Sequence, residues 1–302
     1  MTLRFLSSEL SPVKPGNALF HVLPVPYEKT VSYGNGTAKG PEAILKASDQ
    51  LELWDGKSKP GEEGIYTWPS IDCSGPAEEV IQEISRGVQK ILKMKKLPVV
   101  LGGEHTVTWG VIKGYLDAGV RDFGVVQVDA HADLRDAYEG DKYSHASVMR
   151  RIVEAGIPLV QLGIRAFCEE ERDARKKHKV QAFDAIDLVP KNIFKVKIPK
   201  TFPKKVFFTL DVDGIDPSVL PATGTPVPGG LGWYQTLALF ESVAKQRRII
   251  GFDVMEFAPI EGFHAFDFTA ALLTYKLMGI VQRTQIGDGA RSREIGLRPR
   301  TR

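Results

Sequence analysis

The chain has 302 residues, of which 43% are hydrophobic and 25% are charged, and its formal net charge is +3 at pH 7. This composition is typical of a globular protein that buries a large core without disulfides. The basic residues are spread among acidic neighbours, and no apolar run approaches the ~18 residues of a membrane span. We therefore expect neither a nucleic-acid partner nor a membrane partner.

The two cysteines, Cys73 and Cys168, stand in no metal-binding spacing. They predict free thiols in a reducing compartment. The first residues, MTLRFLSSELSP, contain no continuous apolar stretch of the kind that a signal peptide needs. These features together predict a cytoplasmic protein.

Short apolar strands alternate with amphipathic helices along the chain. Strands are expected at 18–24, 64–71, 98–101, 123–129, 158–164, 180–183, 206–213 and 248–256. Helices are expected from residue 41 and at 76–96, 106–118, 145–155, 233–245 and 266–281, and the basic residues of 172–177 should lie on a solvated helix face. Near-continuous apolar strands suit a sheet covered on both faces. We predict a single α/β domain over residues 1–302, three-layered α/β/α, with a mostly parallel sheet of about eight strands.

Metal-binding side chains follow directly after the apolar run 123–128. Asp129, His131 and Asp133 alternate with two alanines, so in an extended backbone they point to the same side. The carboxyl ends of strands are where open α/β sheets build their sites. Because so many charges in one buried place are costly without a cation among them, this segment predicts a metal site.

Three further strand ends carry side chains of the same kind. His105 follows the Gly102–Gly103 pair, Asp211 and Asp213 stand two residues apart, and the last strand ends near Asp253 and Glu256. A single aspartate after a strand is usually a cap or turn former. Two alternating acidic motifs in one parallel sheet are difficult to explain in that way, and they favour a shared site.

The donor set indicates the metal and its chemistry. Four carboxylates and two imidazoles without a thiolate suit manganese better than a structural zinc ion. Six ligands are too many for one zinc ion, but they fit two ions that share bridging carboxylates. A two-metal site lowers the pKa of a water, so the pattern predicts metal-assisted hydrolysis. The six candidate ligands are His105, Asp129, His131, Asp133, Asp211 and Asp213.

Five segments in this order resemble the signature motifs of the ureohydrolases, the superfamily of arginase and agmatinase. They are GGEHT, DAHAD, SHAS, LDVDGIDPSVLPATGTPVPGG and GFDVMEFAP, and the resemblance begins at PYEKTVSYGNGTAKGPEAI. It covers most of the chain. The segment DAHADLRDAYEGDKYSHAS looks most like bacterial and archaeal agmatinases.

The resemblance implies a centre of two Mn²⁺ ions with a bridging hydroxide that attacks a guanidinium carbon and releases urea. One ion would be held by His105, Asp129, Asp133 and Asp211, and the other by Asp129, His131, Asp211 and Asp213. Asp129 and Asp211 would then bridge the ions. Homo-oligomers, trimers or hexamers, are expected by the same analogy.

The resemblance also implies roles around the metals. Asp133 would accept the proton of the hydroxide, and His145 of SHAS would move protons or assist the leaving amine. Glu256 would grip the guanidinium with support from Thr225. This agrees with the planar donor fork of a guanidinium, which a carboxylate binds in a bidentate way.

Substrate choice is expected in the loop 134–144. Arginases typically carry an asparagine two residues after the last aspartate of DAHAD, where this chain has Arg135. Asp136, Glu139 and Asp141 make the loop acidic, as would suit a substrate that ends in an amine. We therefore predict hydrolysis of agmatine to putrescine and urea, a step of polyamine biosynthesis, with Arg135 and Asp136 near the substrate.

Other functions stay open at this point. Arginase or another guanidino-acid hydrolase, such as a guanidinobutyrase, would use the same chemistry. A two-metal phosphoesterase is disfavoured because no glycine-rich phosphate loop or arginine cluster accompanies the carboxylates. A non-catalytic metal-binding relative is the remaining alternative, although every expected ligand is present.

Overall fold

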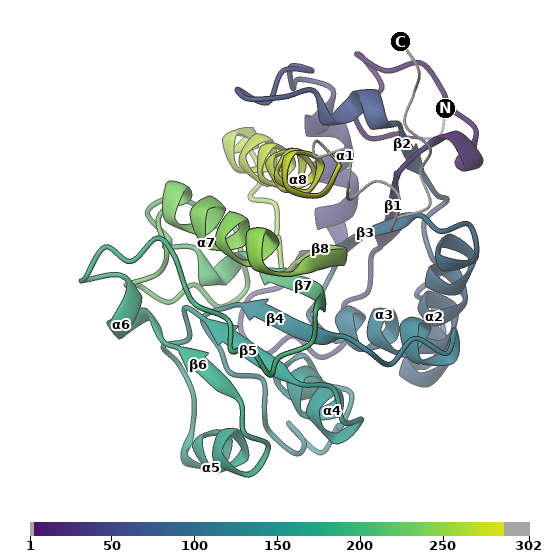
Figure 1. The fold of residues 1–302 in the computed structure, drawn as a ribbon. Coiled ribbons are helices and arrows are strands. Elements are labelled where there is room, and N and C mark those ends of the chain that lie inside the picture. Colours follow the sequence, from purple (N-terminus) through teal and green to yellow (C-terminus); the bar gives the residue numbers. More distant parts are fainter. Residues whose placement is uncertain (1–2, 287–302) are drawn as a thin grey trace.

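The computed structural model describes residues 3–286, and one sheet of eight strands runs through it (Figure 1). The strand order is β2-β1-β3-β8-β7-β4-β5-β6, and every neighbouring pair is parallel. The predicted parallel sheet is therefore confirmed. The strands are β1 (Phe20–Val25), β2 (Ile65–Thr67), β3 (Leu97–Gly102), β4 (Gly124–Val128), β5 (Leu159–Leu162), β6 (Gln181–Phe183), β7 (Lys205–Asp211) and β8 (Arg248–Met255).

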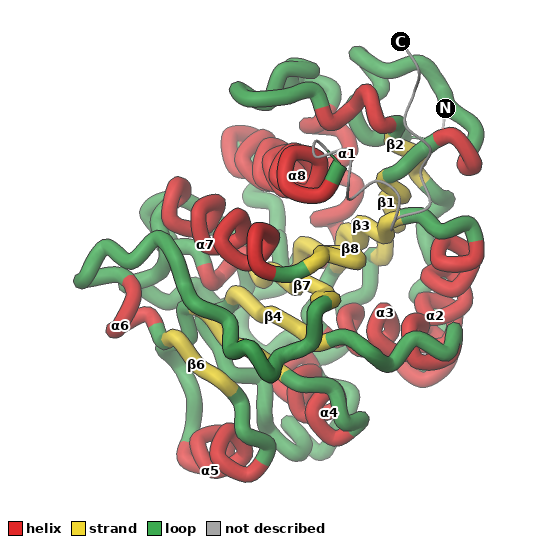
Figure 2. Tube along the Cα trace, viewed as in Figure 1, coloured by secondary structure: helices red, strands yellow, loops and turns green. Residues whose placement is uncertain are grey.

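Helices cover both faces of the sheet (Figures 1 and 2). One buried cluster joins α1, α7 and α8 to one face, and a second joins α2, α3 and α4 to the other. The three-layer α/β/α fold is confirmed. The helices are α1 (Gly40–Ser48), α2 (Ala77–Lys93), α3 (Thr106–Asp117), α4 (Val148–Glu154), α5 (Glu169–Lys177), α6 (Ala185–Leu188), α7 (Trp233–Gln246) and α8 (His264–Gln285).

The packing of α2 on α3 shows how the sequence sets the layers. Ile84 and Val88 lie on the buried face of α2, and Gly110 and Gly114 lie on the facing side of α3. A Cβ added at Gly110 would lie 2.9 Å from the Ile84 Cβ, and one at Gly114 would lie 2.7 Å from the Val88 Cβ. The two glycines therefore let the helices approach closely where any side chain would separate them.

At the carboxyl edge of the sheet, one predicted strand ends early and one predicted helix begins late. The strand predicted to reach residue 213 ends at Asp211, whose side chain accepts a hydrogen bond from Asp213 N (2.9 Å) and turns the chain. The helix predicted from His145 opens as a single 3₁₀ turn, because Ser144 Oγ caps Ala146 N before α4 begins. Both changes place polar side chains on turns above the sheet.

The predicted strand 64–71 is reduced to the three residues of β2, because Pro69 cannot continue a strand ladder. The basic stretch 172–177 lies on α5, where Arg172, Lys176 and Lys177 are exposed as predicted. The prediction is wrong for Arg175, whose side chain is 10% exposed and pairs with Asp184 (3.0 Å). Within residues 3–286, no helix is both long and apolar enough to cross a membrane. Cys73 and Cys168 are free thiols, as predicted.

Candidate metal centre

The six predicted ligands lie together at the carboxyl ends of β3, β4 and β7. His105 stands just before α3, three residues beyond β3. Asp129, His131 and Asp133 follow β4, while Asp211 ends β7 and Asp213 lies on the turn after it. Parallel strands bring these ends to one edge, so segments far apart in sequence form two clusters, which share Asp129.

The deep cluster consists of His105, Asp129 and Asp211, all buried, with Asp133 beside them. The Nδ1 atom of His105 lies 3.1 Å from Asp129 Oδ2, 3.0 Å from Asp133 Oδ2 and 3.3 Å from Asp211 Oδ2. Among the described residues, this nitrogen nevertheless has no hydrogen-bond partner in acceptable geometry. Three oxygens and one nitrogen thus surround a common point, as ligands of a cation do.

A buried chain of hydroxyls holds the other ring nitrogen of His105. Nε2 lies 2.8 Å from Thr209 Oγ1, which lies 3.3 Å from Thr108 Oγ1. Thr108 Oγ1 in turn donates to Asp253 Oδ2 (2.9 Å). If Nε2 carries the proton and donates it to Thr209, Nδ1 is left with a lone pair directed at the carboxylates, the form in which histidine binds metals.

The shallow cluster consists of Asp129, His131 and Asp213. His131 Nδ1 lies 2.9 Å from Asp213 Oδ2 and 3.7 Å from Asp129 Oδ1, and its side chain is 31% exposed. Backbone groups hold the carboxylates in place: His131 N donates to Asp129 Oδ1 (2.6 Å), and Ala130 N donates to Asp213 Oδ1 (2.9 Å). This cluster is therefore the one that faces the solvent side of the site.

The charges of the two clusters cannot all stand without a cation. Burial raises the pKa of Asp129 to about 8, and repulsion from Asp133 and Asp213 adds to the effect. Burial, followed by repulsion from Asp213 and Asp129, raises the pKa of Asp211 well above its usual range. Contact with His105 lowers both pKa values, but it does not outweigh burial and mutual repulsion. Divalent ions would supply the additional positive charge.

The aspartate–histidine pair of the shallow cluster behaves in the opposite way. Burial opposes ionisation of both groups, but their mutual hydrogen bond outweighs it. The pKa of Asp213 is therefore lowered, and that of His131 is raised to about 10. Protonated His131 would serve as a cation for Asp213 in the absence of metal, so metal binding here must displace that proton.

The donor atoms fit the predicted pair of ions. Two groups of nitrogen and oxygen donors, each within 4.8 Å, share Asp129. Asp129 belongs to both groups and Asp211 to the deep one, and the bridging roles of both residues stay predictions. Carboxylate and imidazole donors without thiolate suit manganese chemistry.

Next to the clusters lies a cavity of about 370 Å³. The predicted residues Asp133, Arg135, His145 and Thr225 line it together with His131. Its other lining residues include Tyr138, Phe167 and Glu171. A small substrate in this cavity would therefore touch both the shallow cluster and His145.

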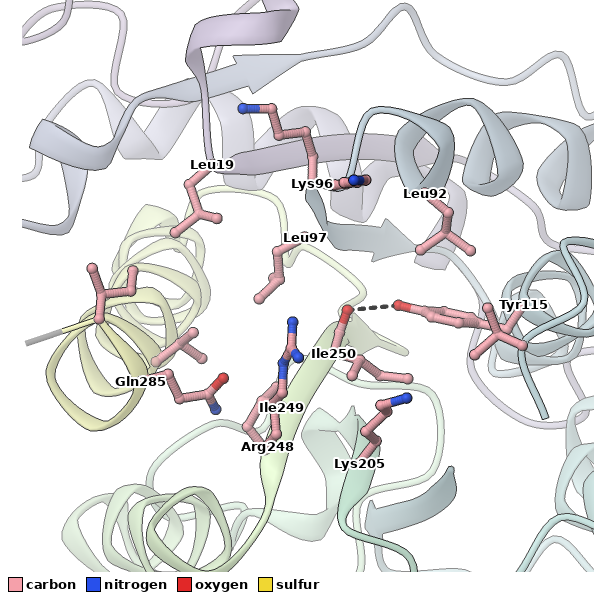
Figure 3. A pocket seen from close by; sticks show the side chains of 14 residues that line it. Leu19, Leu92, Lys96, Leu97, Tyr115, Lys205, Arg248, Ile249, Ile250 and Gln285 are labelled. Carbon is pink, nitrogen blue, oxygen red and sulfur yellow. Dashed lines mark hydrogen bonds between the residues drawn. The ribbon is translucent and has the colours of Figure 1, made fainter. Parts of the chain in front are cut away.

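A second, larger cavity, of about 510 Å³, lies at the opposite end of the strands (Figure 3). Leu19, Leu97 and Ile249 form its apolar walls, and Lys96 and Lys205 stand at its edge. None of the residues that line it is an aspartate, glutamate or histidine. It therefore offers no carboxylate or imidazole to a metal. The cavity beside the clusters is the candidate active site because His131, Asp133 and His145 line it.

Glu256 is fixed beside the deep cluster. It is 7% exposed, its Oε1 accepts a hydrogen bond from His105 N (2.6 Å), and its own N donates to Gly103 O (2.9 Å). Burial, and then repulsion from Glu104, raises the pKa of Glu256 well above its usual range. Glu256 and Asp133 both have positive φ angles, of 61° and 54°. Non-glycine residues in this sparsely populated region cluster at functional sites.

Three predicted substrate residues stand differently from expectation. Glu256, beside the deep cluster, is not among the residues that line the cavity. The Thr225 hydroxyl donates to Asp213 Oδ2 (3.3 Å), so its observed contact is with a candidate ligand, and support of Glu256 stays a prediction. Asp136 is 56% exposed, pairs with Arg151 (3.2 Å) and Arg150 (3.8 Å), and is not among the residues that line the cavity. The structure therefore does not bring Asp136 together with the other site residues.

Four residues around the site were not among the predicted site residues: Thr30, Glu104, Thr108 and Thr209. Each is a polar residue that forms a hydrogen bond with a residue far away in the sequence. Thr30 bonds to Glu104, and Thr108 bonds to Asp253. The position of Glu104 could have identified it. It lies between an apolar strand and a candidate ligand, where a carboxylate is buried at a cost unless it has a role.

Comparison with known proteins agrees with this geometry. The model of the Arginase family matches residues 18–279. An N(1)-aminopropylagmatine ureohydrolase of Synechocystis is 41% identical over 91% of this chain and 93% of its own length. An agmatinase of Pyrococcus horikoshii is 32% identical over 93% of this chain and 99% of its own. The agmatine ureohydrolase structure from Thermoplasma volcanium superimposes with a TM-score of 0.82 at 28% identity, covering 95% of this chain and 97% of that one.

The chain belongs to the arginase family. It is a hydrolase of the agmatinase type, as the sequence motifs predicted. The family implies a binuclear metal centre, for which the deep and shallow clusters are the candidate ligands.

Proposed function

We propose that this protein hydrolyses the guanidino group of a small guanidino-amine, with agmatine cleaved to putrescine and urea. The observation that carries the proposal is the pair of acid–histidine clusters that share Asp129, beside a cavity that His131 and Asp133 line, in a member of the arginase family. This arrangement also weighs against a non-catalytic relative, because the predicted ligands converge.

The protein side chains would bind and orient the substrate. Oε1 of Glu256 accepts from His105 N, and the positive charge of a guanidinium would favour the ionised form of Glu256, which would then accept its donor fork. Two Mn²⁺ ions held by the deep and shallow clusters would lower the pKa of a water and so supply a nucleophile at neutral pH. Asp133 and His145 both line the cavity. In the proposed reaction Asp133 would take a proton, and His145 would give one to the departing amine.

A second candidate substrate is N(1)-aminopropylagmatine. It is favoured by the relatives of that name, from Synechocystis at 41% identity and from Thermus thermophilus at 38%. Proteins named agmatinase stand at 32% and 31%. Both substrates carry a guanidino group. They differ in the aminopropyl group, for which the cavity would need additional room.

A urea-release assay with added Mn²⁺ tests the proposal. The panel contains agmatine, N(1)-aminopropylagmatine, arginine and 4-guanidinobutyrate. Turnover of either of the first two supports the proposal, and their ratio of kcat/KM decides between them. Turnover confined to arginine or guanidinobutyrate would show a guanidino-acid hydrolase instead, and no turnover of any compound by metal-loaded protein would reject ureohydrolysis.

Arg135 provides a sharper test of the substrate's outer end. Among the described residues of 134–144, it is the one charged side chain that lines the cavity, and its guanidinium lies 5.4 Å from the Tyr138 ring. A cation there repels an amine-ended substrate and attracts a carboxylate. For Arg135→Gln we expect kcat/KM to rise a few-fold with agmatine, on the order of two- to fivefold. A fall with agmatine would show that Arg135 contributes to binding, contrary to this view.

Manganese, a homo-oligomeric assembly and a cytoplasmic location complete the proposal. Metal analysis of protein purified without chelators tests the first, with two manganese ions per chain as the expected result. Light scattering on the purified protein tests the second, where a monomer would contradict it.

A further inference from the structure

A hydrogen-bonded chain connects Glu104, Thr30 and His145. Thr30 Oγ1 lies 2.7 Å from Glu104 Oε1 and 3.2 Å from His145 Nδ1, and it also accepts a hydrogen bond from His145 N (3.1 Å). Thr30 belongs to the loop after β1, Glu104 follows β3 and His145 opens the turn before α4. Three segments far apart in sequence thus meet at one hydroxyl.

The hydrogens of this chain can be assigned by counting. A threonine hydroxyl offers one hydrogen and two lone pairs. Glu104 can only accept if ionised, and its other oxygen already accepts from Lys29 N (2.5 Å) and Thr30 N (2.7 Å). The Thr30 hydrogen therefore goes to Glu104, and its lone pairs face His145 N and His145 Nδ1. For the last contact to be a hydrogen bond, Nδ1 must carry a proton.

One other hydroxyl lies near the ring. Ser144 Oγ is 3.4 Å from His145 Nδ1, longer than the contact with Thr30, and it already accepts from Ala146 N (3.3 Å). If Ser144 donated to Nδ1, the opposite tautomer would result. The contact with Thr30 is shorter, and the one hydrogen and both lone pairs of the Thr30 hydroxyl are all used. We therefore take Thr30 as the residue that sets the tautomer of His145.

We propose that Thr30, oriented by Glu104, is a positioning residue that holds His145 with its proton on Nδ1. This leaves Nε2 as the ring nitrogen that exchanges a proton with the neighbouring cavity, which His145 lines. The catalytic consequence rests on the proposed function, in which His145 gives a proton to the leaving amine. The tautomer itself does not.

The same short segment then serves both parts of the site. His105 directs Nδ1 at the carboxylates of the deep cluster, while its neighbour Glu104 anchors the loop that fixes His145. Glu104 is fully buried, and besides Thr30 it accepts from the Thr106 hydroxyl (2.8 Å). An uncompensated carboxylate there would be costly, so these donors account for its burial.

The first test is the tautomer of His145 by nitrogen NMR. Full-length protein with ¹⁵N-labelled histidine is loaded with a diamagnetic divalent ion, Mg²⁺ or Cd²⁺, and studied about two units above the ordinary histidine pKa of ~6.5. The chain has six histidines, so a His145→Asn spectrum identifies the signal. We expect Nδ1 protonated in the wild type, and a shift toward the Nε2-protonated form in Thr30→Val.

Matched variants separate Thr30 from its surroundings. Thr30→Ser keeps the hydroxyl and should keep the wild-type tautomer. Thr37→Val removes a hydroxyl of the same loop, one that donates to Glu28 Oε2 (3.1 Å), and Ser144→Ala removes the competing hydroxyl. Both should leave the His145 signal unchanged. A change in Ser144→Ala with none in Thr30→Val would overturn the proposal.

The second test is kinetic. Loss of one hydrogen bond to the ring should lower kcat of Thr30→Val about tenfold, with KM and metal content within twofold of the wild type. Thr30→Ser should recover most of kcat. A purely structural role would instead change KM, metal content and thermal stability together. Wild-type protein that cleaves no guanidino compound would reject the proposed function, while the NMR result would still decide the tautomer.

Discussion

The deep and shallow clusters hold their side chains by different means. In the deep cluster, His105 is 1% exposed, and a chain of buried hydroxyls that ends at Asp253 fixes its Nε2 atom. In the shallow cluster, His131 is 31% exposed, and backbone N–H groups of the turns hold its carboxylates. One position is therefore organised by the core and the other by loops.

This difference predicts unequal affinities for the two ions. Ligands whose rotamers and tautomers are fixed by the interior lose little freedom on binding a metal. Both sites must release a proton when a metal binds, since burial is outweighed by carboxylate contacts that raise the pKa of His105 as well as that of His131, so the proton does not separate them. The difference lies in how firmly the ligands are held. We therefore expect the deep ion to bind more tightly and the shallow ion to leave first under chelation.

The largest effect should come from the residue that both clusters share. Asp129→Ala is expected to lose most of both ions and to lower kcat/KM by about a thousandfold or more, because neither position keeps its common ligand. Metal analysis after gel filtration measures the loss. Asp117→Ala, at a surface acid paired with Lys113, is the control and should keep both ions. An Asp129→Ala protein that keeps two ions per chain would refute the bridging role.

The next variants remove one cluster at a time. His105→Ala should leave about one ion or fewer per chain, and Asp213→Ala should leave one tightly bound ion in the deep position. Activity should fall by about a hundredfold or more in each, because hydrolysis of this kind uses both ions. Metal titration by calorimetry distinguishes the two. Equal metal affinity in the two variants would contradict the prediction that the deep cluster binds its ion more tightly than the shallow one.

A smaller effect is expected behind the deep cluster. Thr209→Val removes the partner of His105 Nε2 and should weaken the tight metal-binding step by about ten- to a hundredfold. Thr274→Val is the matched control: its buried hydroxyl donates to a carbonyl of its own helix, Ala270 O (3.0 Å), on α8 and away from the metal ligands in sequence. Unchanged affinity in Thr209→Val would mean that packing alone holds His105 in place.

The same contrast explains what the sequence could predict. Asp129, Asp211 and His105 were recognisable because they follow apolar strands, and parallel strands bring their ends together whatever the details of the loops. Thr209, the partner of His105, was not recognisable, since it lies within β7. Asp253 was noted as an acid near a strand end, but it lies within β8, and only the register of the two strands makes it a neighbour of Thr209. The exposed position of Asp136 likewise depends on Arg150 and Arg151 of α4, not on the acidic loop that contains it.

The smallest expected effect lies at the shallow cluster. Thr225→Val removes a long hydrogen bond to Asp213 Oδ2 (3.3 Å), in a place where His131 and Ala130 N already hold the same carboxylate. We expect the weaker metal-binding step to change by only about two- to threefold, since bonds of this length contribute little. Thr225→Ser should be indistinguishable from the wild type. A tenfold loss in Thr225→Val would show that the loop carrying Thr225 organises the shallow position as firmly as the core organises the deep one, and the comparison would fail.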